Sequence, residues 1–256
     1  MTPMKPLFLI SNDDGIHARG IRCLIDVLRP LGDMLVVAPE TERSGMSTSF
    51  TLREPLTCKP VSKEEGLIQY SSNGTPVDCI KLALNLLTDE RKPDLIIAGI
   101  NHGFNGSIAI HYSGTMGAVL EGCMAGYPSI GFSIDDHREE ANFEPSLPHI
   151  RNIVQAVLDN GLPYGVCLNV NIPKHDEIKG TKICRQGKGR WVEEFIPCSH
   201  PDNAKRYWLT GKFLNLEENA GDNDLTSMRQ GYISVVPSCI DVTNHSLIGQ
   251  LQTWGL

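Results

Sequence analysis

Two adjacent carboxylates follow the first apolar run of the chain, in a position that favours cation binding. Residues 7–10 read as a buried strand, and a Ser-Asn-Asp-Asp-Gly turn follows it, with Asp13 and Asp14 near its centre and no Lys or Arg between them and Arg19. An open α/β sheet binds its ligands at the carboxyl ends of its strands, where a cation would neutralise this charge. Side chains alternate along a strand, so both carboxylates can share one ion only where the backbone turns, as Gly15 allows. The same residues also suit an ordinary turn before a helix, so the pair needs support from elsewhere.

Polar side chains follow two further predicted strands. Residues 34–39 form a second buried strand that leads into a polar loop containing Ser44, and residues 94–100 form a third that ends in Asn101 and His102. Parallel strands bring their carboxyl ends to one edge of a sheet, so we expect these side chains near the acid pair.

A fourth polar segment opens a helix. Ser113, Gly114 and Thr115 precede apolar residues at helical spacing. A Ser or Thr in this position is usually a cap, although the free N–H groups of a first helical turn also bind oxyanions. The same choice applies to Thr75 and Asp78, which could do no more than cap their helix.

The elements that position these residues indicate an α/β fold. The first two strands flank a helix over 21–28, and this β-α-β unit implies parallel strands with a right-handed crossover. Further apolar stripes predict three more helices, over 77–87, 116–123 and 147–158. We expect a small antiparallel excursion within 48–72, a strand over 128–134 that completes the sheet, later strands over 165–173 and 231–237, and extended, aromatic-rich hairpins within 181–216. The tail carries Asp241 and His245, which either pair or are solvated separately.

Composition excludes several classes of protein. The 256 residues suffice for one large α/β domain or a core with an appendage, and 41% hydrophobic with 21% charged residues is ordinary for a globular chain. A net charge of −7 argues against binding long nucleic acids, which need a broad cationic surface. No run approaches the roughly 20 apolar residues of a membrane span, and no secretory signal precedes the first strand, so we expect a cytoplasmic protein without membrane contact. The eight cysteines are scattered without zinc-ligand spacing, and we expect reduced, mostly buried thiols.

The ordered set of motifs resembles the SurE family (survival protein E) of metal-dependent nucleotide phosphatases. Each motif alone is weak, but their order along nearly the whole chain is specific. The matching segments are 11–16 (SNDDGI), 37–39 (VAP) with 42–44 (ERS), 74–79 (GTPVDC), 99–103 (GINHG), 112–115 (YSGT) and 231–234 (GYIS).

The resemblance implies a Rossmann-like, three-layer, mostly parallel sheet with an extended β-hairpin arm and a C-terminal oligomerisation segment. It implies a single domain over 1–256, in which 1–135 form the metal and phosphate core and 136–256 supply the remaining sheet, the arm and the tail. It also implies homodimers or homotetramers that exchange the hairpin and the C-terminal segment.

The resemblance further implies one divalent metal cation at the strand edge. Its ligands would be Asp13, Asp14, Ser44 and Asn101, a set of oxygen donors that suits Mg²⁺ or Mn²⁺. The catalytic residues would be Asp13, Asp14 and Asn101. The phosphate would lie among Asn105, Ser113, Gly114 and Thr115. Residues 106–111 depart from the family's usual Gly-Asp-Asp-like stretch, which affects the loop and the substrate preference rather than the metal ligands.

The implied activity is hydrolysis of nucleoside 5′-monophosphates, with 3′-monophosphates and short polyphosphate as further substrates. We expect the metal to polarise the phosphate and a water to attack in line, with Asp13 or Asp14 taking its proton.

Three other functions compete with this one. A phosphatase with an aspartyl nucleophile needs an Asp-x-Asp spacing, which adjacent carboxylates lack. A two-metal phosphoesterase, suggested by the Asn101-His102 pair, needs several more ligands, and His102 more readily orients a neighbour. A non-catalytic nucleotide sensor on the same fold would bind nucleotide without releasing phosphate.

Overall fold

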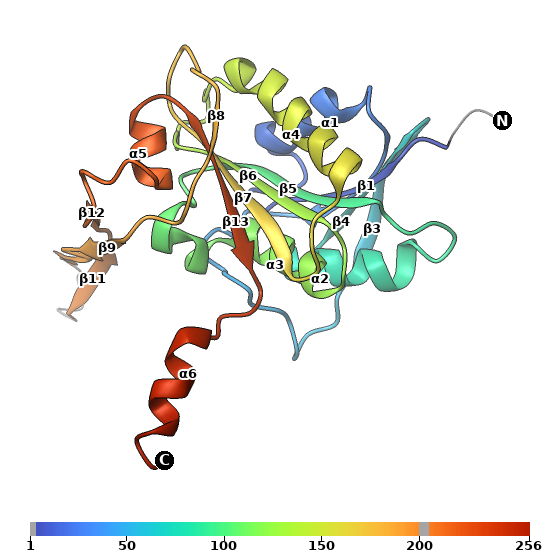
Figure 1. Ribbon diagram of the computed structural model, residues 1–256. Helices are drawn as coiled ribbons and strands as arrows, with labels where there is room; N and C mark the ends of the chain where they lie inside the picture. The colour runs from blue at the N-terminus through green and yellow to red at the C-terminus, as the bar shows by residue number, and fades with distance from the viewer. Residues whose placement is uncertain (1–3, 200–204) are drawn as a thin grey trace.

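A nine-stranded sheet forms the centre of the computed structural model, which describes residues 4–199 and 205–256 (Figure 1). In spatial order, its strands are β3 (Cys58–Glu64), β4 (Leu67–Ser72), β2 (Asp33–Pro39), β1 (Leu7–Ser11), β5 (Leu95–His102), β6 (Ser129–Ile134), β7 (Val166–Ile172), β13 (Ile233–Cys239) and β8 (Thr181–Ile183). The six consecutive strands from β4 to β7 are parallel to one another. The predicted mostly parallel sheet is therefore confirmed.

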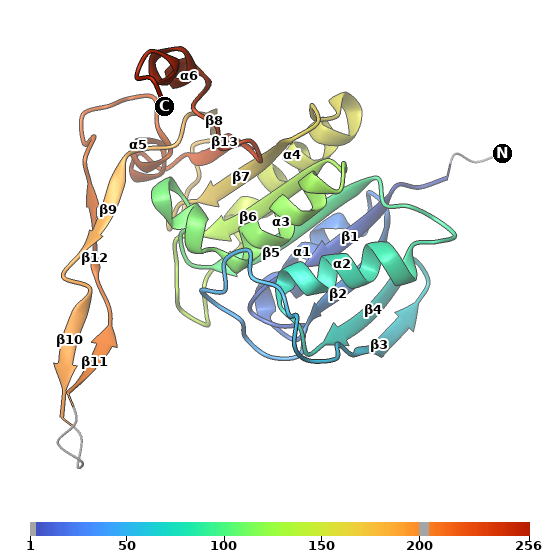
Figure 2. The ribbon, with the colours of Figure 1, turned by 90° about the horizontal axis from the view of Figure 1, so that it is seen from below.

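Helices cover both faces of this sheet (Figure 2). On one face lie α1 (Arg19–Leu28) and α4 (Leu147–Asn160), which follows the short 3-10 helix η3 (Glu144–Ser146). On the other lie α2 (Pro76–Leu82), its π-helical continuation η1 (Ala83–Leu87) and α3 (Gly114–Met124). Because both faces are covered, β1, β2 and β5 are runs of buried apolar residues. The four predicted helices and the three layers are confirmed.

The prediction that the strand over 128–134 completes the sheet is wrong. This strand is β6, which lies between β5 and β7, and the sheet continues through the antiparallel β13 to β8. The polar residues of β7 explain the error, because Asn169 and Asn171 are buried although such alternation is typical of a strand with one solvated face.

The predicted excursion within 48–72 is shorter than expected. Only β3 and β4 form an antiparallel pair, and β4 also joins the main sheet beside β2. The preceding loop is irregular and is held by Asp78, which accepts hydrogen bonds from the Thr51 amide at 3.0 Å and hydroxyl at 2.7 Å. Asp78 also forms a capping box with Thr75 at the start of α2, so the predicted cap is present.

The hairpin arm projects from the sheet as an antiparallel ribbon (Figure 2). It consists of β9 (Gly189–Val192), β10 (Phe195–Cys198), β11 (Arg206–Leu209) and β12 (Lys212–Asn215). The predicted hairpins are confirmed, although β8 belongs to the main sheet and residues 200–204 lie outside the described chain.

Two helices complete the C-terminal part. The short α5 (Asp224–Arg229) packs near the base of the arm, and α6 (His245–Gln252) extends away from the sheet without a buried residue (Figure 1). Just before α6, Asp241 pairs with His245 at 2.8 Å, one of the two expected arrangements.

The cysteines form no disulfide in the described chain. The eight cysteines are free; four are buried, three are half-buried and Cys239 is exposed. Within residues 4–199 and 205–256, no helix has the length and apolar character needed to cross a bilayer.

Candidate active site

The acid pair lies in a tight turn directly after β1. Gly15 has φ +102°, a conformation that glycine adopts freely, and the Asn12 side chain donates to its carbonyl at 2.9 Å. The backbone N–H of Arg43 donates to the Asp13 carbonyl at 2.7 Å, which fastens the turn to the loop after β2. The backbone therefore leaves the strand at Asp13 and Asp14, as sharing one ion requires.

The start of α3 lies against the Asp13 carboxylate. The Thr115 hydroxyl donates a hydrogen bond to Asp13 Oδ1. A Cβ at Gly114 would stand only 2.9 Å from Asp13 Oδ2, so a larger residue has no space there. Ser113 caps the helix by accepting the Met116 N–H at 3.0 Å. The structure thus brings the predicted phosphate turn to the predicted acid pair.

Asp14 is oriented from β5. The backbone N–H of His102 donates to Asp14 Oδ2 at 3.2 Å. The His102 ring has other partners, because its Nδ1 lies 3.0 Å from the Arg138 carbonyl oxygen and it packs nearly perpendicular to the Phe143 ring, with the ring centroids 5.2 Å apart. His102 therefore orients its neighbour through the main chain, as expected, and its imidazole is engaged elsewhere.

Both carboxylates carry charge that their surroundings do not compensate. Burial raises the pKa of Asp13 from 3.8 to about 6, although the Thr115 hydrogen bond lowers it, and the neighbouring Asp14 charge raises it further. Burial likewise raises the pKa of Asp14 to about 6; the His102 N–H opposes this shift and the charge of Glu42 adds to it. No basic side chain is among these causes. The negative charge of the pair can therefore be neutralised by a bound cation or by protonation.

Of the other two predicted metal ligands, Asn101 is buried and Ser44 is exposed. Asn101 is buried in the last part of β5, where its amide nitrogen donates to the Gly103 carbonyl at 2.8 Å. Within the described chain its side-chain oxygen has no hydrogen-bond partner and is available as a ligand. Ser44 is exposed and its hydroxyl donates to Glu42 at 2.8 Å, so it makes no hydrogen bond to either aspartate.

A closed ring of buried amides holds Asn105. Its N–H donates to Asn171 Oδ1 at 2.8 Å, Asn171 Nδ2 donates to Asn169 Oδ1 at 3.0 Å, and Asn169 Nδ2 donates to the Asn105 carbonyl at 2.8 Å. The Asn105 side chain itself donates to Ser133 on β6 at 2.8 Å. Asn169 and Asn171 were not among the predicted site residues, and the polar alternation in their strand was the available signal.

The donors at this edge fit a hard divalent cation. Among the described residues there is no group of three or more His, Cys, Asp or Glu side chains that could hold a metal ion. The predicted ligands would instead be two carboxylates with an amide and a hydroxyl oxygen, the chemistry that Mg²⁺ and Mn²⁺ prefer. Directly before the acid pair, Ser11 Oγ and Asn12 Oδ1 are buried without a hydrogen-bond partner in the described chain. A cation and its waters would supply both charge and partners here.

The fold and the site together define a Rossmann-like α/β protein with an acidic site at the carboxyl edge of its parallel strands. The model of the family "Survival protein SurE" matches residues 8–193. The chain belongs to the SurE family, which confirms the resemblance seen in its motifs.

Similar proteins match over nearly the full length. A "5'-nucleotidase SurE" from Bacteroides thetaiotaomicron is 49% identical, over 98% of this chain and 96% of its own length. A protein of the same name from Phocaeicola vulgatus is 47% identical, over 100% and 99%. The crystal structure of the SurE protein from Aquifex aeolicus superimposes with a TM-score of 0.84 at 36% identity, covering 98% of this chain and 100% of that one.

Proposed function

We propose that this protein is a divalent-metal-dependent nucleotidase that hydrolyses nucleoside 5′-monophosphates, with 3′-monophosphates and short polyphosphate as further substrates. The observation that carries the proposal is the contact between the acid pair after β1 and the start of α3, through Thr115 and Asp13. This contact supports the proposal, because it joins the acid pair to the first turn of a helix, where N–H groups suit phosphate. The relatives named 5'-nucleotidase SurE support the choice of substrate.

Asp13, Asp14, Ser44 and Asn101 would hold one Mg²⁺ or Mn²⁺. When bound, the cation supplies Lewis-acid catalysis and neutralises charge at the phosphate. Ser44 would have to exchange its hydrogen bond with Glu42 to take part. The site lies within residues 1–135, the proposed metal and phosphate core.

The protein's own groups would bind the phosphate and move the proton. Ser113, Gly114 and Thr115 would contact the phosphate where α3 begins, and the Gly114 N–H suits the charge that develops on the phosphate oxygens. The Ser113 N–H donates to the Ile110 carbonyl at 3.4 Å and the Thr115 backbone bonds to Asp13, so both would have to change partner to bind phosphate. Asn105 Nδ2 carries two hydrogens, one of which is donated to Ser133, so the other remains for a phosphate oxygen. Asp13 or Asp14 would accept the proton of the attacking water, and Asn101 would complete the catalytic group.

Phosphate release from a panel of nucleoside monophosphates tests this function. The assay compares Mg²⁺, Mn²⁺ and chelator for the parent protein, Asp14→Ala and Asp26→Asn, whose exposed carboxylate on α1 is a matched control. We expect metal-dependent release by the parent and the control, and none by Asp14→Ala. Near-normal turnover of Asp14→Ala would contradict the assignment. Nucleotide binding without phosphate release in Mn²⁺ would favour the sensor.

We also propose that the protein forms homodimers or homotetramers through the arm and the C-terminal segment. The arm exposes Phe195, Trp208 and Leu209 to 66%, 68% and 71%, and α6 has no buried residue. Apolar surface of this kind is typical of interfaces. Light scattering should show a smaller species for the double variant Trp208→Ser, Leu209→Ser than for Tyr164→Ser, which removes a ring that is 80% exposed elsewhere. An unchanged mass would contradict the proposed interface.

A further inference from the structure

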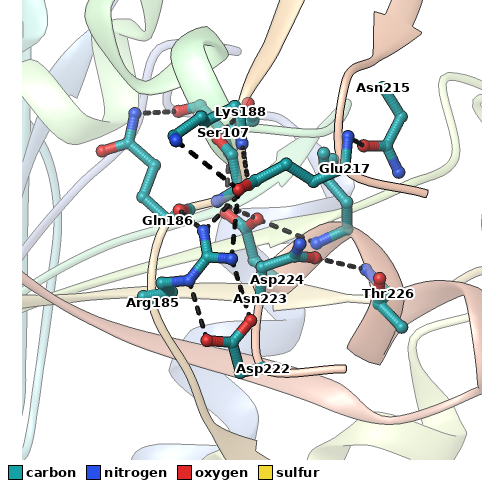
Figure 3. Close-up of polar contacts among 12 residues, drawn as sticks. Ser107, Arg185, Gln186, Lys188, Asn215, Glu217, Asp222, Asn223, Asp224 and Thr226 are labelled. Atoms are coloured by element: carbon teal, nitrogen blue, oxygen red, sulfur yellow. Dashed lines mark hydrogen bonds and ion pairs between the residues drawn. The ribbon is translucent and has the colours of Figure 1, made fainter. Parts of the chain in front are cut away.

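A buried carboxylate joins the base of the hairpin arm to the segment that would bind phosphate, residues 105–115. Asp224, the first residue of α5, has no exposed surface. Its Oδ2 accepts the Ser107 N–H at 2.7 Å, and its Oδ1 accepts the Gly187 N–H at 2.8 Å (Figure 3). Gly187 lies between β8 and β9, where the chain enters the arm. One side chain therefore fixes two segments that are distant in sequence.

Ser107 is held through every polar group it has. Besides the bond from its N–H to Asp224, its hydroxyl donates to the Gly187 carbonyl at 2.7 Å. Its own carbonyl accepts from Gln186 Nε2 at 2.9 Å. Ser107 is fully buried and has φ +49°, a left-handed conformation uncommon for residues other than glycine. The base of the arm thus maintains an unfavourable backbone conformation at the start of the 3-10 helix η2 (Ser107–Tyr112).

The described partners of the Asp224 carboxylate are all backbone N–H groups, which donate hydrogen bonds to it. Its third bond is from the Leu225 N–H at 2.8 Å, and no ion pair to it occurs among the described residues. The nearby Arg185 pairs instead with Glu217 at 2.8 Å and with Asp222 at 2.9 Å (Figure 3). Hydrogen bonds to an ionised acceptor are strong, and a buried N–H left without one is costly. Asp224 therefore holds both segments more firmly than a neutral side chain could.

We propose that Asp224 is a positioning residue, which fixes residues 105–115 against the arm so that they are arranged for phosphate. This inference rests on the proposed nucleotidase function. Asn105 lies two residues before Ser107, and η2 leads from Ser107 directly to the cap of α3 at Ser113. A shift at Ser107 would move both ends of the phosphate site. Asp14 and Asn101 keep their own supports, because His102 and Gly103 lie outside residues 105–115. Asp13 keeps the bond from the Arg43 N–H to its carbonyl.

Asp224→Asn tests the proposal, with Asp222→Asn as its matched control. Asparagine keeps the shape, but one of its terminal atoms is an NH₂ group that would face an N–H donor. Asp222 belongs to the same cluster, is 67% exposed, and makes no bond to Ser107. The measurements are KM and kcat for adenosine monophosphate in Mn²⁺, together with calorimetric affinities for inorganic phosphate and for Mn²⁺ alone.

We expect Asp224→Asn to raise KM and the phosphate Kd at least tenfold, the scale of one lost charge-assisted hydrogen bond, with Mn²⁺ affinity within about twofold of the parent. Asp222→Asn should stay within about twofold in all three. A merely structural role would lower the amount of active protein without changing KM or the phosphate Kd. Equal phosphate affinity in the two variants overturns the inference.

Two further results separate this inference from the proposed function. A parent protein that releases no phosphate from any nucleotide contradicts the function, while the phosphate affinities still test the role of Asp224. If Asp224→Asn does not fold, Gln186→Ala replaces it, because the one described partner of this exposed side chain is the Ser107 carbonyl. We expect about a threefold rise in KM and in the phosphate Kd from that neutral hydrogen bond, and unchanged values overturn the inference.

Discussion

Thr115 donates a hydrogen bond to the carboxylate of Asp13, although the two residues are 102 positions apart in sequence. This bond joins the carboxyl end of β1 to the first turn of α3. It makes the acid that would bind a cation and the turn that would bind phosphate parts of one site. It also lowers the pKa of Asp13 against the effect of burial, so the carboxylate ionises more readily.

Removing the Thr115 hydroxyl should lower the affinity for the cation without abolishing binding. Thr115→Val keeps the shape of the side chain but leaves Asp13 without its donor, so the pKa of Asp13 rises and protons compete better with the cation. We expect about a tenfold lower Mn²⁺ affinity at pH 6 and a smaller difference at pH 8. Thr115→Ser, which retains the hydroxyl, should match the parent. Calorimetric titration at both pH values measures this, and equal affinities of Thr115→Val and the parent at pH 6 would contradict it.

Two glycines of α3 offer a comparison between the site and the core. A Cβ at Gly114 would lie 2.9 Å from Asp13, and a Cβ at Gly122 would lie 2.6 Å from Ile96 in the sheet. Both Gly→Ala variants should lower the free energy of unfolding by about 1–3 kcal/mol, because a packed interior resists added methyl groups. Only Gly114→Ala should also lose Mn²⁺ affinity and at least tenfold in kcat/KM. Loss of metal affinity in both variants would show that general destabilisation, and not contact with Asp13, is responsible.

Much of the site could be predicted because its residues directly follow buried strands. Asp13 and Asp14 come after β1 and Asn101 lies one residue before the end of β5, and parallel pairing alone brings those ends to one edge. The side-chain partner of Ser44 could not be predicted, because it depends on the conformation of an exposed loop in which Glu42 is within reach.

The burial of polar side chains beside the site could not be predicted from a single sequence. Alternating asparagines predict a strand with one wet face, and only the packing of the 105–107 loop against β7 buries Asn169 and Asn171. The role of Asp224 could not be predicted either, because its partners Ser107 and Gly187 are 117 and 37 positions away in sequence. Local patterns predict elements well, but buried polar networks depend on which elements meet.

The amide ring should matter for phosphate rather than for the metal. Asn171→Ala removes the acceptor of the Asn105 N–H and the donor to Asn169, so two buried polar groups lose partners. We expect a loss of about 2–3 kcal/mol in the free energy of unfolding and a phosphate Kd raised at least fivefold, with Mn²⁺ affinity nearly unchanged. Urea unfolding and calorimetry measure these quantities. Asn160→Ala, on the exposed end of α4, is the control, and an unchanged phosphate Kd in Asn171→Ala would contradict the role of the ring.

The raised pKa of Asp13 makes the metal-free protein less stable as the pH rises. Its pKa is about 6 in the folded state against an ordinary value of 3.8, so between these values the folded state binds more protons than the unfolded state. The stability from this group is therefore lost as pH rises from about 4 to above 6, by at most about 3 kcal/mol. In chelator, Asp13→Asn should gain about 2 kcal/mol relative to the parent between pH 4.5 and 7.5, measured by urea unfolding. Mn²⁺ should stabilise the parent at pH 7.5 far more than the variant, and a gap between the two that does not change with pH would contradict this account of Asp13.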